Sequence, residues 1–470
     1  MTASPLVSVV ISSNGRCTSL AKTLHALRWQ RYREFEVCVV CGPARDGTHE
    51  LIAEAVAAGH LKSAVCDTPN LSQSRNIGIG IAAGTHIAFI DDDALPEPVW
   101  LEQLLHGFDD PAVAGVGGLV FAPDARTAQF RYSTCDRFGN ARHGLDQPAD
   151  AGAFPLSAHF PHVMGTNAAF RRDALIAIGG FDEEYEYYLD EADVCCRLVD
   201  AGYAIRQRRD APVHHKFLSG TVRDGEGITV RRYPVVKNQL YFSLVNGRRH
   251  ASLPEIIKQS MAFAGRHRSE LEQHVERGAL HPRALADFDA DWERALERAL
   301  SRGLAGRRRI RPADDLRAES RFVRYPTNDQ AGERRRTGHV AIVLPSGPPD
   351  ASTLAAARDC ALKHGKDARM TRVFIPSGGG DPTADGVDLI GNVWLHRVGA
   401  GECPVLQTLP PEAWKAEHYR RCLHFAIERV AAYDPFDALI DRSGYDLRHT
   451  DALNPDRIDL AHCSVYDNSR

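Results

Sequence analysis

Short apolar runs alternate with helical patterns along the first 110 residues of the chain. Runs rich in β-branched residues predict buried strands at 6–11, 35–40 and 86–90. Helical patterns lie between them at 18–30 and 50–58. Because strands that alternate with helices form parallel sheets covered on both faces, we expect an α/β fold whose ligands bind beyond the carboxyl ends of the strands.

The pattern changes after about residue 245. Residues 252–305 have the apolar spacing of helices and many Arg and Glu residues, whereas 306–338 are polar and rich in Arg. We interpret 246–337 as a helical connector that ends in a linker. We expect its basic runs, Arg307–Arg309 and Arg334–Arg336, to lie on solvated faces.

A second alternation of strands and helices begins near residue 340. It predicts a smaller Rossmann-like α/β domain over 338–470, with strands at 340–345, 373–376, 393–398 and 437–440 and helices at 352–364 and 413–433. We therefore expect a larger domain over 1–245, the connector, and this second domain.

The composition of the chain disfavours some classes of function. The chain has 470 residues and a formal net charge of -4, whereas a protein that binds nucleic acid through its phosphates carries a basic excess. The 11 cysteines are scattered along the chain, and pairs such as Cys38/Cys41 and Cys195/Cys196 lie in apolar runs, as reduced cytosolic thiols do. No segment reaches the roughly 18 apolar residues of a membrane span, and Met1–Pro5 does not begin a secretory signal. We expect a cytoplasmic protein without a nucleic-acid partner, with peripheral contact at the inner face of the membrane left open.

Three adjacent carboxylates, Asp91, Asp92 and Asp93, follow the predicted strand at 86–90. Neighbouring anions repel one another, so such a run makes sense where a cation or a hydrogen-bonding ligand neutralises it. Oxygen ligands at alternate positions suit Mg²⁺ or Mn²⁺, which commonly bridge to phosphates. Asp91 and Asp93 are therefore a candidate cation site, and the alternative is an acidic turn at the end of a strand.

Three other short segments carry groups that could take part in chemistry. Asp190-Glu191 opens a helical pattern, where a carboxylate either acts as a general base or caps the helix. His214-His215 offers imidazoles that either bind a metal or are structural. Gly165-Thr166-Asn167 either lets the backbone approach a ligand, with Asn as a donor to a sugar hydroxyl, or forms a tight turn. The absence of P-loop, HExxH and GxSxG motifs disfavours P-loop enzymes, zincins and serine hydrolases.

In their order along residues 1–245, these pieces resemble the family 2 glycosyltransferases of the GT-A fold. The segments similar to that family's motifs are Ser12–Gly15, Gly42–Thr48, Asp67–Pro69, Asn70–Gly78, Asp91–Asp93, Gly165–Arg172, Gly179–Asp182, Asp190–Glu191 and His214. Several motifs in the family's order are more specific than any one of them.

The resemblance implies roles for individual residues. The implied nucleotide-sugar site consists of Ser12, Asn14, Gly42, Asp46, Asp67, Arg75, Asn76, Asp91 and Asp92. The implied acceptor side is Gly165, Thr166 and Asn167. A divalent cation, Mn²⁺ or Mg²⁺, would be held by Asp93, His214 and Asp91, with His215 as the alternative imidazole. Because the family's usual Glu-Asp pair is reversed, Glu191 and Asp190 are both candidates for the catalytic base, and we favour Glu191.

The implied function is the inverting, metal-dependent transfer of a sugar from a nucleotide-diphosphate sugar to an acceptor hydroxyl that the sequence does not identify. A base and a departing diphosphate on opposite faces of the sugar would invert the anomeric centre. The alternatives are a nucleotidyltransferase, which would need a Gly-rich basic loop after the first strand, and a catalytically decayed sugar-binding or scaffold protein. Residues 338–470 resemble the amino-terminal half of a GT-B glycosyltransferase, which implies an accessory domain.

Overall fold

The computed structural model describes residues 5–328, except 126, 146, 149–152, 221, 225–227 and 318–319, together with 339–344, 355, 370–376, 386–390, 393–398, 411–434, 436 and 438–441. The chain divides into two compact units. Unit 1 holds residues 1–120 and 129–327, and unit 2 holds 121–128 and 328–470. The run Arg334–Arg336 and, apart from residue 355, the predicted helix at 352–364 lie outside the described residues.

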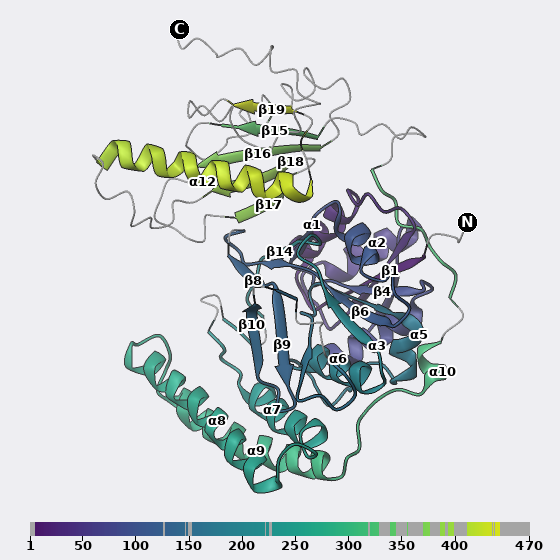
Figure 1. Ribbon diagram of the computed structural model, residues 1–470, viewed down its shortest axis with the longest axis vertical. Helices are drawn as coiled ribbons and strands as arrows, with labels where there is room; N and C mark the ends of the chain where they lie inside the picture. The colour runs from purple at the N-terminus through teal and green to yellow at the C-terminus, as the bar shows by residue number, and fades with distance from the viewer. Residues whose placement is uncertain are drawn as a thin grey trace. The chain divides into compact units, whose positions relative to one another are not determined.

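A seven-stranded sheet organises unit 1 (Figure 1). Its strands are β1 (Val7–Ser13), β2 (Phe35–Cys41), β3 (Lys62–Val65), β4 (His86–Phe89), β6 (Val113–Gly117), β12 (Ala168–Arg171) and β13 (Ala204–Gln207). The order is β13-β6-β12-β4-β1-β2-β3, in which β12 runs antiparallel to β4 and β6 and the other pairs are parallel. The predicted α/β fold is therefore confirmed, with one antiparallel strand inside the sheet.

Helices cover both faces of this sheet because its strands are apolar on both sides. One face packs against α1 (Cys17–Leu27), α2 (Thr48–Ala57) and α4 (Trp100–His106). The other face packs against α3 (Leu71–Ile81), α5 (Arg172–Ala177), α6 (Asp190–Asp200) and α7 (Tyr233–Asn246). In β1, Val9 belongs to the first core and Val10 to the second, as the two-residue period of a strand requires.

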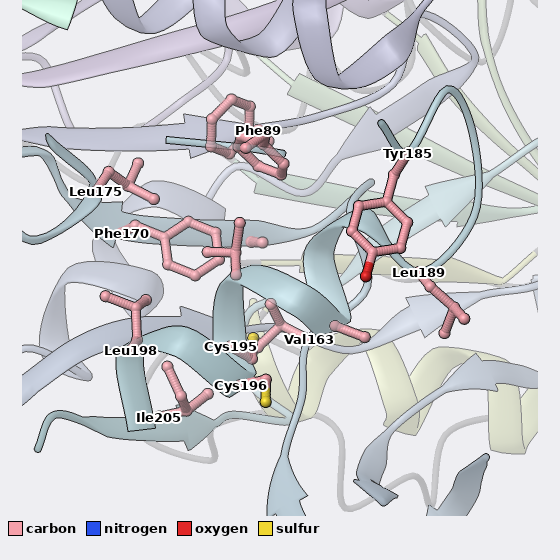
Figure 2. Close-up of a cluster of buried hydrophobic side chains, with 14 of the residues drawn as sticks. Phe89, Val163, Phe170, Leu175, Tyr185, Leu189, Cys195, Cys196, Leu198 and Ile205 are labelled. Atoms are coloured by element: carbon pink, nitrogen blue, oxygen red, sulfur yellow. The ribbon is translucent and has the colours of Figure 1, made fainter. Parts of the chain in front are cut away.

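The second core fixes α6 against the sheet (Figure 2). Phe89 and Phe170 meet edge to face, with ring centroids 6.2 Å apart. The α6 residues Cys195 and Cys196 are fully buried and unpaired, and burial raises the pKa of both thiols. Cys195 acts as a small apolar packing group, and Cys196 Sγ accepts a hydrogen bond from Arg137 Nη1 over 3.1 Å, so α6 is held along its length.

Two smaller sheets, of three and four strands, accompany the seven-stranded sheet. The three-stranded sheet contains β9 (Tyr132–Asp136), β10 (Ala141–Leu145) and β11 (His159–Pro161), and the four-stranded sheet contains β5 (Ala94–Pro96), β7 (Val120–Phe121), β8 (Ala128–Phe130) and β14 (Val213–His215). The pairing of β14 with β5 places His215 opposite Ala94. A residue far along the chain thereby reaches the end of β4. These strands of two to five residues were not predicted.

Residues 246–327 of the predicted connector belong to unit 1. α8 (Leu253–Glu276) and α9 (Arg283–Leu304) form a hairpin against α7, and a short helix, α10 (Ala313–Leu316), follows (Figure 1). The segment after α9 is attached rather than free: the Tyr325 hydroxyl donates to the Leu24 carbonyl over 2.7 Å. The Arg308 side chain is only 17 % exposed and pairs with Asp182 and Asp193. The expectation that Arg308 is solvated is therefore wrong, because two buried carboxylates bind it.

Unit 2 contains a five-stranded sheet in the order β17-β18-β16-β15-β19. Its elements are β15 (His339–Val343), β16 (Met370–Pro376), β17 (Gly386–Ile390), β18 (Val393–Val398), α12 (Pro411–Tyr433) and β19 (Ala438–Asp441). The strands are parallel except β17, and α12 packs Leu423, Ile427 and Val430 on one face. Among the helices that the structure describes in either unit, none is long and apolar enough to cross a bilayer.

Candidate active site

Four parallel strands of the seven-stranded sheet end at a cavity of about 250 Å³. The residues that line it at the ends of these strands or just after them are Ser12, Ser13, Asn14, Gly42, Cys66, Asp91, Asp92 and Asp93. Segments 186–187, 215–223 and 231–234 supply further lining residues. The cavity lies at the carboxyl ends of the strands, where open α/β sheets bind ligands.

Asp91, Asp93 and His215 form a group that can hold a metal ion. One ligand atom of each lies within 4.8 Å of the other two. His215 Nε2 is 3.2 Å from Asp93 Oδ1 and 3.8 Å from Asp91 Oδ2. Among the described residues, buried Asp93 Oδ1 has no other polar partner. Two carboxylates and an imidazole suit a divalent ion such as Mn²⁺ or Mg²⁺, so the residues present fit a cation.

The three carboxylates of the acidic run titrate differently. Burial raises the pKa of Asp91, although His215 and Arg75 oppose the shift. Burial likewise raises the pKa of Asp92 to about 6. For Asp93 burial acts in the same direction, but His215 and Arg16 outweigh it and lower the pKa. Asp93 is therefore the carboxylate of the run that is held most firmly in its charged form.

Arg16 connects the acidic run to the segment after β14. Its Nη1 lies 3.0 Å from Asp92 Oδ1 and 3.0 Å from Asp93 Oδ2. Its Nη2 donates to the carbonyls of Leu218 and Ser219 over 3.1 and 2.9 Å. The guanidinium thus neutralises the same carboxylate that a cation would bind.

Replacing Arg16 by Gln is expected to tighten Mn²⁺ binding about tenfold in the absence of nucleotide. A guanidinium beside Asp93 repels a divalent ion, and a partly solvated charge at this range is worth ~1–4 kcal/mol. Isothermal titration calorimetry measures the change, with the exposed Arg45→Gln as the matched control. Equal or weaker Mn²⁺ binding by Arg16→Gln would show that Arg16 does not compete with a cation.

Arg75 links the acidic run to the start of α6. The buried guanidinium pairs with the Asp190 carboxylate, and its Nη2 is 4.0 Å from Asp91 Oδ1. A Cβ at Gly165 would stand 2.2 Å from Nη2, so a glycine is needed for Arg75 to occupy this place. The predicted cation and base regions are therefore adjacent, with Arg75 between them.

The two candidate bases have different environments. The Asp190 side chain is 1 % exposed and its charge is engaged by Arg75. Burial, and then the neighbouring Asp190, raises the pKa of Glu191 to about 8. Neither carboxylate lines the cavity itself. A base works best when its pKa lies near the working pH, and of the two carboxylates Glu191 has the raised pKa that suits this role.

The turn before α6 has a strained backbone. Tyr188 and Leu189 have φ values of 77° and 67°, which cost non-glycine residues about 1 kcal/mol or more each. Asn238 Nδ2 of α7 donates to the carbonyls of Tyr187 and Tyr188 over 2.6 and 3.0 Å. α7 therefore holds the turn that directs the first residues of α6 toward Arg75.

Some of the residues predicted to bind the nucleotide sugar line the cavity and others do not. Ser12, Asn14, Gly42, Asp91 and Asp92 line it. Asp46 instead accepts hydrogen bonds from the Cys17 backbone amide (2.8 Å) and the Thr48 hydroxyl (2.6 Å), which tie the starts of α1 and α2 together. Asp67 is exposed beside the lining residues Cys66 and Thr68.

Asn76 and the predicted acceptor residues have mainly structural contacts. The Asn76 amide bonds the Phe181 backbone in both directions over 2.8 Å. Asn167 is fully buried: its Nδ2 donates to two carbonyls and its Oδ1 accepts from Trp100. Its amide is therefore not available to a sugar, which corrects the predicted acceptor role. Thr166 Oγ1 lies 3.4 Å from the Asp91 backbone amide and so supports the acidic run.

The predicted role of His214 as a metal ligand also needs correction. Its Nε2 lies 2.7 Å from Glu97 Oε1, and both side chains are buried away from the acidic run. The two-residue period of β14 points adjacent side chains to opposite faces, so His215 reaches Asp93 and His214 does not. The imidazole of the candidate cation site is therefore His215.

Several cavity residues were not singled out from the sequence, namely Arg16, Glu186, Tyr187, Phe217, Leu218, Arg223 and Arg231. The Arg223 guanidinium carbon lies 4.2 Å from the Phe217 ring centroid and 5.9 Å from that of Tyr187. Arg16 could have been suspected, since it follows a strand-end loop directly. The others lie in loops whose paths depend on α7 and β14.

Comparisons with known proteins show which sequences this chain resembles. The sequence model described as Glycosyl transferase family 2 matches residues 8–179. A glucosyl-dolichyl phosphate glucuronosyltransferase of Haloferax volcanii is 29 % identical over 229 residues, which are 45 % of this chain and 69 % of that protein. Glycosyltransferase AglE of the same organism is 33 % identical over 215 residues, 44 % of this chain and 65 % of the relative.

Among solved structures, a mannosyltransferase from Pyrobaculum calidifontis in complex with GDP-Man and Mn²⁺ aligns with a TM-score of 0.40 and 17 % identity. The alignment covers 64 % of this chain and 88 % of that one.

Proposed function

We propose that this chain is a glycosyltransferase that transfers a sugar from a nucleoside-diphosphate sugar, with the help of a divalent cation and with inversion. The match of residues 8–179 to the glycosyl transferase family 2 model supports the proposal. The observation that carries the proposal is the trio Asp91, Asp93 and His215 at the rim of the strand-end cavity.

The cavity offers separate places for the parts of a donor. We propose that the nucleotide lies along the loops after β1 to β3, where Ser12, Asn14 and Gly42 line the cavity. We propose that the diphosphate lies near the trio, because a bound cation would neutralise the charge that develops on the departing phosphate. Arg16 would bind the same phosphates once it leaves Asp93.

Glu191 is the proposed general base. Its ionised form would accept the proton of the acceptor hydroxyl as that oxygen attacks the anomeric carbon. Asp190 stays paired with Arg75 and keeps the base oriented. With the base and the leaving diphosphate on opposite faces of the sugar, a single displacement inverts the anomeric centre.

Nucleotide binding tests the proposal. With Mn²⁺ present, we expect one nucleoside diphosphate or its sugar to raise the melting temperature by about 5–10 °C, because a ligand at 100 times its Kd adds ~2.7 kcal/mol to stability. Asp93→Asn and His215→Ala should lose the Mn²⁺-dependent part of the shift. The exposed Glu54→Gln should keep it.

The same samples distinguish the alternative functions. Release of free sugar from a nucleoside-diphosphate sugar supports a transferase. Release of pyrophosphate from a nucleoside triphosphate and a sugar phosphate would instead support a nucleotidyltransferase. Nucleotide binding without transfer of sugar from a donor to any tested acceptor would favour a decayed binding protein. If no nucleotide bound with or without Mn²⁺, the proposal would be refuted.

We further propose a separate role for each part of the chain, and we propose that the protein is cytoplasmic. Residues 1–245 would be catalytic, 246–337 would brace them, and 338–470 would form an accessory, partial GT-B-like domain with a part in acceptor binding. The described cysteines are unpaired, among them Cys38, Cys41 and Cys66, which supports a reducing compartment.

A further inference from the structure

One side of α8 exposes apolar side chains. Leu253 is 37 % exposed and Met261 is 58 % exposed. Together with Pro254, Ile257 and Lys258 they line a shallow hollow on the helix surface. Residues 253, 257 and 261 are four apart, which places them along one side of a helix. The inward side is filled by Ile256, Ser260, Ala264 and Leu271.

Exposed, positively charged side chains lie in and near this hollow. Arg248 and Arg249 lie in the turn that leads into α8, and Lys258 lies in the hollow itself. Within the part of the chain that the structure describes, none of the three has a carboxylate within ion-pair distance. The nearest acidic residue in sequence, Glu255, is occupied by Ser252, whose amide and hydroxyl donate to it over 2.8 and 2.7 Å.

The start of the hairpin has unpaired positive charge, whereas the charges farther along it are largely paired. The later part of α8 and the facing part of α9 carry both carboxylates and arginines: Glu272 and Asp289 pair with Arg268, Asp287 with Arg283 and Asp291 with Arg294. An anionic surface would therefore be attracted mainly to the end of the hairpin that holds Arg248, Arg249 and Lys258.

We propose that the basic end of the α8–α9 hairpin, defined by Arg248, Arg249, Leu253, Pro254, Ile257, Lys258 and Met261, docks the protein on an anionic lipid bilayer. A few apolar side chains can insert at the headgroup boundary while cations bind lipid phosphates. A stable protein interface needs roughly 20–30 residues on each side, many more than this surface offers. The surface is thus suited to a membrane rather than to a second copy.

Vesicle co-sedimentation of the full chain tests the proposal. We expect binding to vesicles of phosphatidylcholine with one half phosphatidylglycerol, at least tenfold weaker binding to phosphatidylcholine alone, and release by 0.5 M NaCl. Met261→Glu should weaken binding about tenfold, whereas Val65→Glu, at a site 57 % exposed in β3, should not. The triple charge reversal of Arg248, Arg249 and Lys258 to Glu should abolish binding.

A second triple variant controls for net charge. Reversal of Arg45, Arg283 and Arg307, three exposed arginines elsewhere, changes the charge equally and should leave most of the binding. Equal loss in both triple variants, equal binding to neutral and anionic vesicles, or no vesicle binding would overturn the proposal. So would a dimer, detected by light scattering, that Met261→Glu dissociates. The same melting temperature for every variant excludes unfolding as the cause.

Discussion

Replacing Glu191 by Gln is expected to lower the turnover number of sugar transfer by a factor of about 10²–10⁴, the usual contribution of a general base. The amide keeps the size and hydrogen-bonding capacity of the side chain but cannot take the acceptor proton. Steady-state assays at saturating donor measure the loss, with Glu54→Gln as the control. Full transfer by Glu191→Gln would mean that Asp190 or another group is the base.

The pH dependence provides an independent signature of Glu191. Because burial and Asp190 raise its pKa to about 8, the transfer rate should rise with pH and level off above about pH 8. The folded pKa lies above the ordinary value of about 4.3. Protonated Glu191 therefore contributes stability that is present at acid pH and is lost as pH rises toward 8. Urea unfolding at pH 6 and pH 9 should show a smaller pH-dependent loss for Glu191→Gln than for the wild type.

Arg308→Ala is expected to lower the free energy of unfolding of unit 1 by about 3–5 kcal/mol, the typical effect of leaving a buried charge without its partner. The side chains of Asp182 and Asp193 are both 0 % exposed, and Arg308 Nη1 pairs with each of them. These carboxylates raise the pKa of Arg308, although burial opposes them. The loss should appear in urea unfolding monitored by circular dichroism.

Two further variants distinguish the loss of the Arg308 ion pairs from a general effect of mutating the segment after α9. Arg307→Ala removes an exposed neighbour and should change stability by less than about 0.5 kcal/mol. Arg308→Lys keeps the charge but loses the second arm, which donates to Asn246 Oδ1 over 2.6 Å, so it should fall between the two. If Arg308→Ala and Arg307→Ala were equally stable, the segment after α9 would not brace α6.

The strand ends were readable from the sequence because they depend on local pattern. Asp91–Asp93 follows an apolar run, and parallel strands bring their carboxyl ends to one edge, so Ser12, Gly42 and the acidic run meet as expected. The choice between His214 and His215 was not readable. It depends on the register of β14 against β5, two strands of three residues each.

Buried polar contacts limited the assignment of individual roles. Asn76 and Asn167 occupy positions that resemble family motifs, yet their amides hold backbone groups in place. A side chain that binds a ligand and one that satisfies a buried carbonyl have the same letter in a sequence. Arg308 shows the converse case: an Arg-rich run reads as solvated, and only the fold shows that two carboxylates face it.

The central claim is that Asp91, Asp93 and His215 hold a divalent cation against the diphosphate of a sugar nucleotide. Crystals of the protein grown with Mn²⁺ and a bound nucleoside diphosphate, measured at the manganese absorption edge, test it directly. We predict one anomalous peak in contact with these three side chains and with the diphosphate. A nucleotide bound in the cavity with no peak there, or a peak ligated by other residues, would contradict the account.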